Sequence, residues 1–474
     1  MGRTFGMLLV IGGLLAFLVL LSGSFYLLAG WTGWGLNSLL NSLTGSEGVH
    51  RAWVYYGAAI ANLLTLMMVV MMISGSLLTV AERKWSALIQ NRIGANRILV
   101  GGSALGGIPY LAADALKMLT KERVEPTGRT RFLYSIAPML AFAPVFALFA
   151  IIPVGPGIPL AAIVPAAAGL TAPIDPIALQ VAAIDAGVLY LFAIASLSVY
   201  GTTLAGWSSN NKLALLGGVR ASSQMISYEV SLGLSLVGVM MCYRTLRLDE
   251  MVVAQGTSVI GPVPALGLLL QPVGFLIFFA SSFAETKRAP FDLPEGESEI
   301  VGYFVEYSGM KFGMMFLAEF IEIVVLSAVT TAVFLGGWHP LVVSTEWLRG
   351  AVSPLWFGAI CAASFIAKMI VLMWLQLTIR WLLPRFRFDQ IQKLCWKILL
   401  PAAIVNVFVT AALLLIADDG NGRVDPGDLR LVAWAGVITF VVLGVITAAV
   451  GRAPAAATAH AHADAHGAAH GAGH

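Results

Sequence analysis

Hydrophobic and polar positions alternate in long blocks along the chain: apolar runs of about twenty residues are separated by polar connections. A run of that length is what a helix needs to cross the hydrocarbon core of a bilayer. The pattern predicts ten spanning helices, near 6–29, 54–80, 132–153, 183–205, 224–243, 267–284, 314–336, 354–376, 398–417 and 431–450. The predicted fold class is therefore all-α, a polytopic integral membrane protein with about 9–10 transmembrane helices.

Three segments stand apart from this pattern. The first apolar run follows Arg3 and is rich in small residues, so it fits either a retained membrane helix, which we expect, or a signal peptide. The stretch 158–170 contains Pro159 and Pro165 and is predicted to be a loop at the membrane surface. The tail 453–474 consists largely of alanine, glycine and histidine, and such low complexity predicts disorder.

Composition agrees with a membrane protein, because 58% of the 474 residues are apolar and 11% are charged, whereas soluble domains carry about 25% charged residues. The net charge of +3 is too small to favour nucleic acid as a partner. The three cysteines lack the spacing of an iron–sulfur cluster, a zinc site or a disulfide framework. We therefore expect no metal centre in this chain.

The few charges are unevenly distributed. Nineteen of the 28 basic residues and 11 of the 25 acidic residues fall in four alternate connections, 82–131, 206–223, 285–312 and 379–397. Basic residues stay on the cytoplasmic side of a membrane, so these connections are predicted to be cytoplasmic, as are both termini of a ten-helix chain. The first and third of these connections are longer than ordinary helix connections of about 2–8 residues, which indicates a function beyond linking helices.

The first of these connections carries two amphipathic stretches. Apolar residues recur at helical spacing around Trp85 in 81–97, which predicts a helix that leaves the membrane along its surface. A second amphipathic helix is predicted in 108–123, with Asp114 and Lys117 among its polar residues. Two interpretations remain open: the basic residues bind anionic lipid headgroups, or the two helices border an opening for a lipophilic substrate with a polar head.

The third connection places four carboxylates within eight positions, at Asp292, Glu295, Glu297 and Glu299. Asp292 and Glu295 fit the N-cap and the capping box of a helix, but that role does not account for the others. Clustered carboxylates repel one another, so their protonation is expected to be coupled. The segment is thus either a coupling element that responds to a nearby change of charge or a solvated acidic loop.

Five ionisable residues lie within apolar runs: Asp185, Glu229, Glu319, Glu322 and Lys368. A charged side chain at mid-membrane costs roughly 2.5–3.5 kcal/mol on insertion, so such residues are functional candidates by default. Asp185, Glu319 and Glu322 are expected near span ends, where that cost is smaller. Glu229 lies about one turn into its predicted helix and could form an inward-facing polar track with Glu319.

Six motifs in this order resemble the H-chain family of bacterial proton-pumping NADH:quinone oxidoreductases, respiratory complex I. They are ERKWSALIQNRIGANR (82–97), ADALKM (113–118), LAGWSSNNKLALLGGVRASSQMISYE (204–229), AETKRAPFDLPEGESE (284–299), EYSGMKF (306–312) and PRFRFDQ (384–390). On this resemblance the chain divides into an additional N-terminal span (1–53), a membrane core of the family type (54–417), an additional C-terminal span (418–452) and the tail (453–474).

The resemblance implies a subunit of a translocase that has no redox centre of its own. Such a chain forms the quinone entrance and tunnel in the bacterial cytoplasmic membrane, with ubiquinone or menaquinone as substrate. NADH, FMN and iron–sulfur clusters are then bound by partner subunits. The implied partners are the peripheral-arm quinone-site and iron–sulfur subunits and the small membrane subunits that lead to antiporter-like subunits.

The resemblance also assigns residues by matched position. The residues implied for quinone binding are Arg83, Arg92, Arg97, Asp114, Lys117, Arg288, Asp292 and Glu295. The residues implied for proton coupling are Glu229, Glu285, Glu297, Glu299, Glu306 and Glu319. Two alternatives remain: the homologous subunit of a membrane-bound hydrogenase or ferredoxin-oxidising complex, and a stand-alone ion/proton antiporter that uses Glu229 and Lys368.

Overall fold

The computed structural model describes residues 2–45, 51–94, 96–99, 107–164, 176–260, 263–293, 302–341, 343–417 and 426–452. Within these residues, nine helices are long and apolar enough to cross a membrane, and a shorter apolar helix, α11 (Pro272–Glu285), accompanies them. These ten correspond one by one to the predicted runs, so the all-α membrane fold is confirmed. The remaining regular structure is short.

The spanning helices are, in chain order, α1 (Gly2–Thr44); α2 (Arg51–Asn62), which continues through the π-helical η1 (Leu63–Met71) into α3 (Met72–Ile89); α5 (Arg131–Phe149); α7 (Gly187–Ser208); α8 (Lys212–Tyr243); α12 (Met310–Phe334); α14 (Pro354–Leu382); α15 (Phe388–Leu394), which continues through η4 (Cys395–Leu399) into α16 (Leu400–Ala417); and α17 (Pro426–Arg452). The short helices are α4 (Pro109–Thr120), α6 (Leu160–Ile163), α9 (Leu248–Gln255), α10 (Gly267–Leu270) and α13 (Thr345–Ala351). Strand β1 (Gly155–Ile158) pairs antiparallel with β2 (Ile177–Leu179), and β3 (Ser258–Ile260) pairs with β4 (Val263–Pro264).

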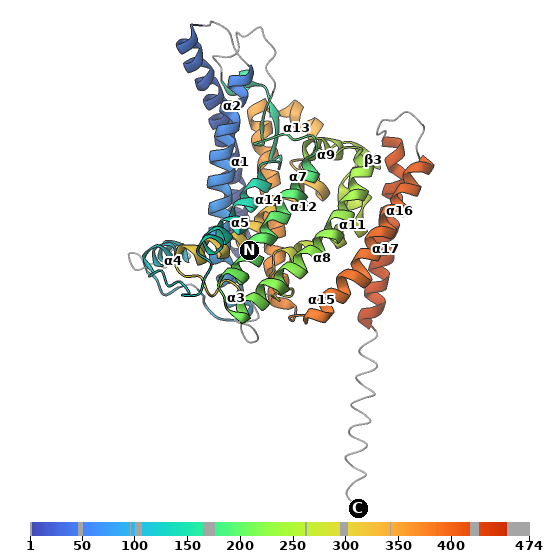
Figure 1. Ribbon diagram of the computed structural model, residues 1–474. Coiled ribbons are helices and arrows are strands. Elements are labelled where there is room, and N and C mark those ends of the chain that lie inside the picture. Colours follow the sequence, from blue (N-terminus) through green and yellow to red (C-terminus); the bar gives the residue numbers. More distant parts are fainter. Residues whose placement is uncertain are drawn as a thin grey trace, which may run out of the picture.

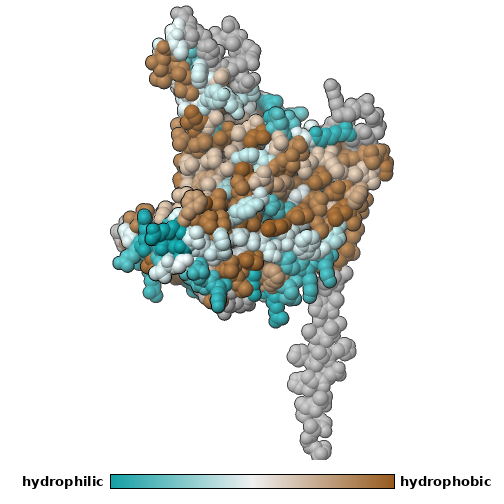
Figure 2. All heavy atoms as spheres, in the orientation of Figure 1, coloured by the Kyte–Doolittle hydropathy of each residue, from teal (hydrophilic) through white to brown (hydrophobic). Residues whose placement is uncertain are grey.

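Helix α12 forms the centre of the bundle (Figure 1). In its most apolar stretch 78% of the residues are buried, against 17% for the helix that ends in α16 and 22% for α17, which lie at the periphery. The outer helices expose large apolar side chains, which make a broad hydrophobic belt in Figure 2. Because lipid tails are as apolar as leucine, such a belt is stable in a bilayer.

The polar connections gather at two opposite ends of the bundle. The end of α3, together with α4 and α15, lies at the lower side of Figure 1, whereas α9, α13 and β3 lie at the upper side. Figure 2 shows hydrophilic residues along that lower side, below the apolar belt. The parts of the charged connections that carry α4 and α15 therefore lie on one face, as predicted, and the assignment of that face to the cytoplasm remains a prediction.

The predicted surface helix at 81–97 is wrong beyond residue 89. Helix α3 ends at Ile89, and Asn91 has a φ of +51°, which turns the chain back. Gly94 then packs so tightly on α3 that a Cβ there would lie 2.4 Å from the Cβ of Ala87. The backbone turns here because Asn91 has a left-handed conformation and Gly94 packs closely against α3, and both interrupt the helix.

The predicted polar connection 206–223 is also mostly helical, because α8 begins at Lys212 rather than near residue 224. The side chain of Asn211 caps α8 by accepting from the N–H of Leu213 at 3.0 Å. Gly206 of α7 and Gly218 of α8 let the two helices approach closely, since a Cβ on either would lie within 3.4 Å of the other. Both glycines fall within the predicted connection, and both serve helix packing.

Helix α1 is longer than the predicted first span and packs into the bundle. Its 43 residues correspond to a length of about 65 Å, about twice the hydrocarbon core of a bilayer. Tyr26 is fully buried and donates a hydrogen bond to the carbonyl of Pro156 at 2.7 Å. This contact joins α1 to β1 and favours the interpretation of α1 as a retained helix.

Candidate functional site

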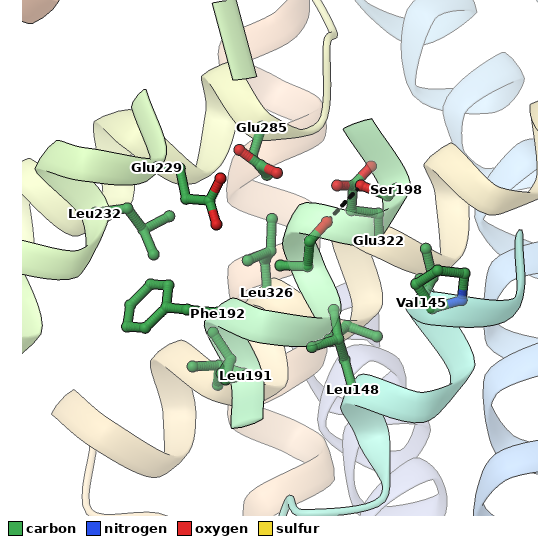
Figure 3. Close-up of a pocket in the computed structure, with 14 residues that line it drawn as sticks. Val145, Leu148, Leu191, Phe192, Ser198, Glu229, Leu232, Glu285, Glu322 and Leu326 are labelled. Atoms are coloured by element: carbon green, nitrogen blue, oxygen red, sulfur yellow. Dashed lines mark hydrogen bonds between the residues drawn. The ribbon is translucent and has the colours of Figure 1, made fainter. Parts of the chain in front are cut away.

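Three carboxylate side chains from different helices meet at a small cavity inside the bundle (Figure 3). Glu229 comes from α8, Glu285 from the last residue of α11 and Glu322 from the middle of α12. Apart from Ser198, the other side chains that line the cavity are apolar. The cavity measures about 30 Å³, which is enough for about two water molecules at roughly 10–15 Å³ each.

The carboxylates at this cavity are largely withdrawn from bulk water. Glu285 and Glu322 have 5% and 6% of their surface exposed, and Glu229 is partly buried. In Figure 3 the carboxyl groups of Glu229 and Glu285 point toward each other. Among the described residues, Oε2 of Glu285 has no hydrogen-bond partner. A buried polar atom without a partner is costly, so water in the cavity or a proton on the carboxyl group would stabilise this arrangement.

Two buried cationic side chains follow Glu285 in the turn after α11. The Nζ atom of Lys287 lies 3.9 Å from Oε2 of Glu322, at the edge of the cavity. Lys287 has a φ of +54°, a left-handed conformation that is uncommon for a lysine. The turn aims Lys287 at α12, while Arg288 contacts a different group of residues.

Arg288 belongs to an ionic network centred on Glu82 of α3. Its guanidinium group lies 2.6 Å from Oε2 of Glu82, and it also stacks over the ring of Phe320 at 3.7 Å. Arg380 of α14 binds the other carboxylate oxygen of Glu82. The side chains of Arg288 and Glu82 are 6% and 12% exposed. Because they are nearly buried, each of these opposite charges needs the other as its partner.

The residues assigned to the quinone entrance are only partly brought together. Arg83 of α3 forms an ion pair of 2.6 Å with Asp114 of α4, which fixes the amphipathic helix to the spanning one. The backbone N–H of Arg97 donates to the hydroxyl of Tyr110 at 2.8 Å. The other two basic residues of this group are exposed, and they are Arg92 and Lys117.

Asp292 lies where two charged connections meet. Arg385 donates a hydrogen bond to the carbonyl of Asp292 and lies 3.8 Å from its carboxylate. The N–H of Phe386 donates to the carbonyl of Pro290 at 3.1 Å. The remaining acidic residues of this segment fall outside the described residues, and they are Glu295, Glu297 and Glu299.

Glu306 and Glu319 do not line the carboxylate cavity. The carboxylate of Glu306 accepts a hydrogen bond from Asn211, and its carbonyl accepts from Tyr134 at 2.8 Å. Tyr134 stacks on Tyr307 with ring centroids 4.1 Å apart. Glu319 is 3% exposed on α12 and is not part of the cavity wall, where Glu229 meets Glu285 and Glu322. The expected polar track between Glu229 and Glu319 remains a prediction.

Sequence reasoning left three contributors out of the assigned site: Glu322, Glu82 and Lys287. Glu322 was among the residues in apolar runs, but the resemblance assigned Glu319 instead. A signal did exist, because two acids three residues apart in one span require a polar neighbour. The ion pair between Glu82 and Arg288 joins residues 206 positions apart and leaves no local signal.

Lys368 and Asp185 take structural positions away from the cavity. The Nζ atom of Lys368 donates three hydrogen bonds, to the carbonyls of Leu335 at 2.8 Å and of Gly337 and His339 at 2.7 Å. All three donors of its ammonium group are thereby used at the end of α12. Asp185 precedes α7, is 94% exposed and lies 3.2 Å from Arg247. Neither residue supports the antiporter alternative.

The amino-acid sequence is similar to those of a known protein family. Residues 61–411 match the family described as NADH dehydrogenase. The H subunit of NADH-quinone oxidoreductase from Rhodospirillum centenum is 41% identical over 372 residues, which cover 77% of this chain and 98% of the relative. The corresponding subunit from Cytophaga hutchinsonii is 40% identical over 340 residues, 71% of this chain and 91% of the relative. That from Geobacter sulfurreducens is 39% identical over 368 residues, 76% and 96% respectively.

Proposed function

The chain belongs to the NADH dehydrogenase family, as a membrane subunit of the H type of NADH-quinone oxidoreductase. We propose that it forms the quinone entrance and tunnel. We also propose that it couples quinone reduction to proton translocation. Electrons reach the quinone from NADH through FMN and iron–sulfur clusters bound by partner subunits. The chain spans the bacterial cytoplasmic membrane with both termini in the cytoplasm. Its neighbours are the peripheral-arm subunits and the membrane subunits that lead to the antiporter-like subunits.

The observation that carries the coupling proposal is the cavity shared by Glu229, Glu285 and Glu322. Negative charges confined among apolar side chains repel one another strongly, so the proton occupancy of one carboxyl group depends on the charge of the others. Water in the cavity can carry a proton between groups that do not touch. The three carboxyl groups therefore act as one proton-binding unit.

The turn after α11 connects this unit to the face where quinone is reduced. Lys287 and Arg288 are consecutive, with the first directed at Glu322 and the second at Glu82. A change of charge at the face that carries Glu82 and Asp292 alters the field at these cations and, through them, the proton affinity of the cavity. In this proposal, only the turn that carries Lys287 and Arg288 has to move for the charged face to influence the carboxylate cavity.

The entrance side is supported by the contact between α3 and α4. The ion pair of Arg83 and Asp114 holds α4 beside the end of α3. Helix α4 exposes Leu116 and Leu119 to 60% and 65%, the amphipathic character of a helix that lies at a membrane surface. A lipophilic quinone tail would pass such a helix, and its polar head would meet the ionic residues behind it.

The coupling proposal is tested by Glu285→Gln, which keeps the shape of the side chain and removes its titratable proton. In membrane vesicles we expect NADH-driven, quinone-dependent proton pumping to be lost while the subunit still copurifies with its complex. Glu346→Gln is the matched control, because Glu346 is exposed on α13 at the opposite end of the bundle and its loss should leave pumping unchanged. Undiminished pumping by an assembled Glu285→Gln complex would contradict the coupling role.

A further inference from the structure

A second cavity lies outside the carboxylate site, between the connection 121–130, the start of α5 and the start of α12. It measures about 140 Å³. Its walls include polar and charged side chains, those of Arg123, Glu125 and Lys311, beside the side chains of Tyr134, Met310 and Met314. It has room for a small polyatomic group, and the proposed quinone and proton roles make no use of it.

The electrostatics of this cavity favour an anion. The Nζ atom of Lys311 donates to Glu125 at 2.9 Å, and Arg129 forms an ion pair with the same carboxylate. The hydrogen bond from Lys311, followed by the charges of Lys311, Arg129 and Arg123, holds the pKa of Glu125 below its usual value. Within the part of the chain that the structure describes, Arg123 has no carboxylate partner of its own. Two cations, Arg123 and Lys311, and one carboxylate, Glu125, line the cavity. Nearby, the charge of Arg129 is opposed by that of Glu306, which acts on Tyr134 in the wall, so positive charge remains.

The start of α12 adds to this positive field. Helix α12 begins at Met310 after Gly309, which has no side chain to accept hydrogen bonds from the first N–H groups. The positive end of the helix dipole therefore faces the region of the cavity. Lys311 also lies 4.7 Å from the centroid of the Tyr134 ring, which orients its ammonium group against the cavity wall.

Apolar side chains border the cavity on the side of the membrane. Met310 and Met314 line the cavity, and Met310 is 49% exposed. Tyr134 and Met310 lie at the starts of α5 and α12, two helices that are long and apolar enough to cross a membrane, so the cavity lies where the polar connections meet these apolar helices. If an anionic group bound here carries hydrocarbon chains, these chains would lie against the neighbouring apolar surface.

We propose that this cavity binds the phosphate of an anionic phospholipid headgroup, with Arg123, Lys311 and the first turn of α12 around the phosphate and the acyl chains over Met310. The bound lipid bridges the connection 121–130 and α12. Ser308 already joins these segments, because the N–H of Val124 donates to its hydroxyl at 2.7 Å. The lipid thus reinforces an existing contact beside α4.

A photoactivatable phosphatidylglycerol added to the purified, delipidated complex tests this proposal. We expect cross-links to peptides that contain 121–130 or 310–314, and competition by unlabelled phosphatidylglycerol but not by phosphatidylcholine. Arg123→Gln should lower this labelling about tenfold, the effect of losing one charge-assisted hydrogen bond. Arg131→Gln is the matched control, since Arg131 is exposed near the cavity without lining it.

Other outcomes would overturn the proposal. Equal labelling of the Arg123→Gln complex and the wild type would show that the cavity is not the lipid site. Displacement of the label by inorganic phosphate at concentrations where phosphatidylglycerol does not compete would identify a site for free anions. If Arg123→Gln prevents assembly, Arg123→Lys is used instead, because it keeps the positive charge. We expect this variant to be labelled, and loss of labelling in the assembled complex would contradict the proposed electrostatic binding of the phosphate.

Discussion

The buried ionic residues of this chain are mostly compensated one by one. Glu82 accepts from Arg288 and Arg380, and Lys368 donates to three carbonyls. Removing one partner of a buried pair leaves an uncompensated charge, which commonly costs about 3–5 kcal/mol. Glu285 differs, because one of its buried oxygens has no partner among the described residues. That difference is why Glu285, rather than Glu82, is the informative residue for a proton role.

His339 shows how burial sets a protonation state outside the spanning helices. It lies between α12 and α13, with Nε2 2.9 Å from the carbonyl of Val252. Its pKa is lowered to about 4, mainly by burial and to a smaller extent by the charges of Lys368 and Arg349, against the raising effect of the hydrogen bond to Val252. The ring is therefore neutral at pH 7 and donates its Nε2 proton to that carbonyl.

We predict that His339 makes the folded state less stable in acid. The unfolded chain, in which histidine has a pKa of about 6.5, binds this proton between pH 6.5 and pH 4, whereas the folded chain does not. Stability is thus lost as pH falls through this window, by about 3 kcal/mol in total. The measurement is the unfolding midpoint of the detergent-solubilised complex against pH, compared with His339→Gln. Parallel pH profiles for the two proteins would contradict the prediction.

Among the elements, α12 carries the central role, and it is held at both ends by lysines. At its start Lys311 pairs with Glu125, and beyond its end Lys368 of α14 binds the carbonyls of the final turn and of the loop that follows. Cations are favourable at the C-terminus of a helix because the last carbonyls lack intrahelical partners. Because α12 also carries Glu322, these two lysines define where that carboxylate stands relative to α8 and α11.

We predict that Lys368→Met loosens the end of α12 without abolishing the proton site. Three carbonyls would lose a charged donor, so the free energy of unfolding should fall by about 2–3 kcal/mol. The amides of Leu335 and Gly337, which donate to Thr331, should exchange with deuterium faster in mass spectrometry.

The control for this change is Lys393→Met, since Lys393 is 65% exposed and, among the residues that the structure describes, forms an ion pair only with Asp389, four residues earlier. We expect it to leave deuterium exchange at 335–339 unchanged. Loss of proton pumping in an assembled, thermally stable Lys368→Met complex would instead indicate that Lys368 takes part in proton transfer.

The whole molecule is a bundle with two unlike ends. One end gathers α4, α15 and the charged connections, and the other gathers α9, α13 and the small β3–β4 sheet (Figure 1). Helix α12 links the two ends through the middle of the bundle. Helices α1 and α17 lie mainly outside the part that matches the family, residues 61–411, and cover opposite flanks of the bundle.

We predict the orientation of the bundle from its charge distribution, and cysteine labelling can test it. The three native cysteines are buried, so a membrane-impermeant maleimide should report only on introduced ones. Arg349→Cys on the exposed face of α13 should react in right-side-out spheroplasts, and Lys121→Cys after α4 should react only in inside-out vesicles. The reverse pattern would invert the assigned topology.

Much of the fold and part of the candidate site follow from sequence. Within the described residues, the apolar runs identify the nine helices long enough to cross a membrane and the shorter α11, because such a helix satisfies its own backbone and therefore depends on local composition. The prediction fails at residues 90–97 and at the start of α8, where Asn91 and the contact of Gly206 with Gly218 decide the path. Those features depend on close approach between chain segments rather than on hydropathy.

The sequence by itself determined that this chain is a membrane bundle, which of its connections share a face, and that acids within spans need partners. Only the tertiary structure decided which acids share a cavity. Glu319 and Glu322 are three residues apart on α12, and of these two it is Glu322 that lines the cavity with Glu229 and Glu285. Each residue of a helix rotates its side chain by about 100°, so the rotation of α12 against α8 and α11 selects the participant. That rotation results from packing along the whole bundle, which no local pattern in the chain records.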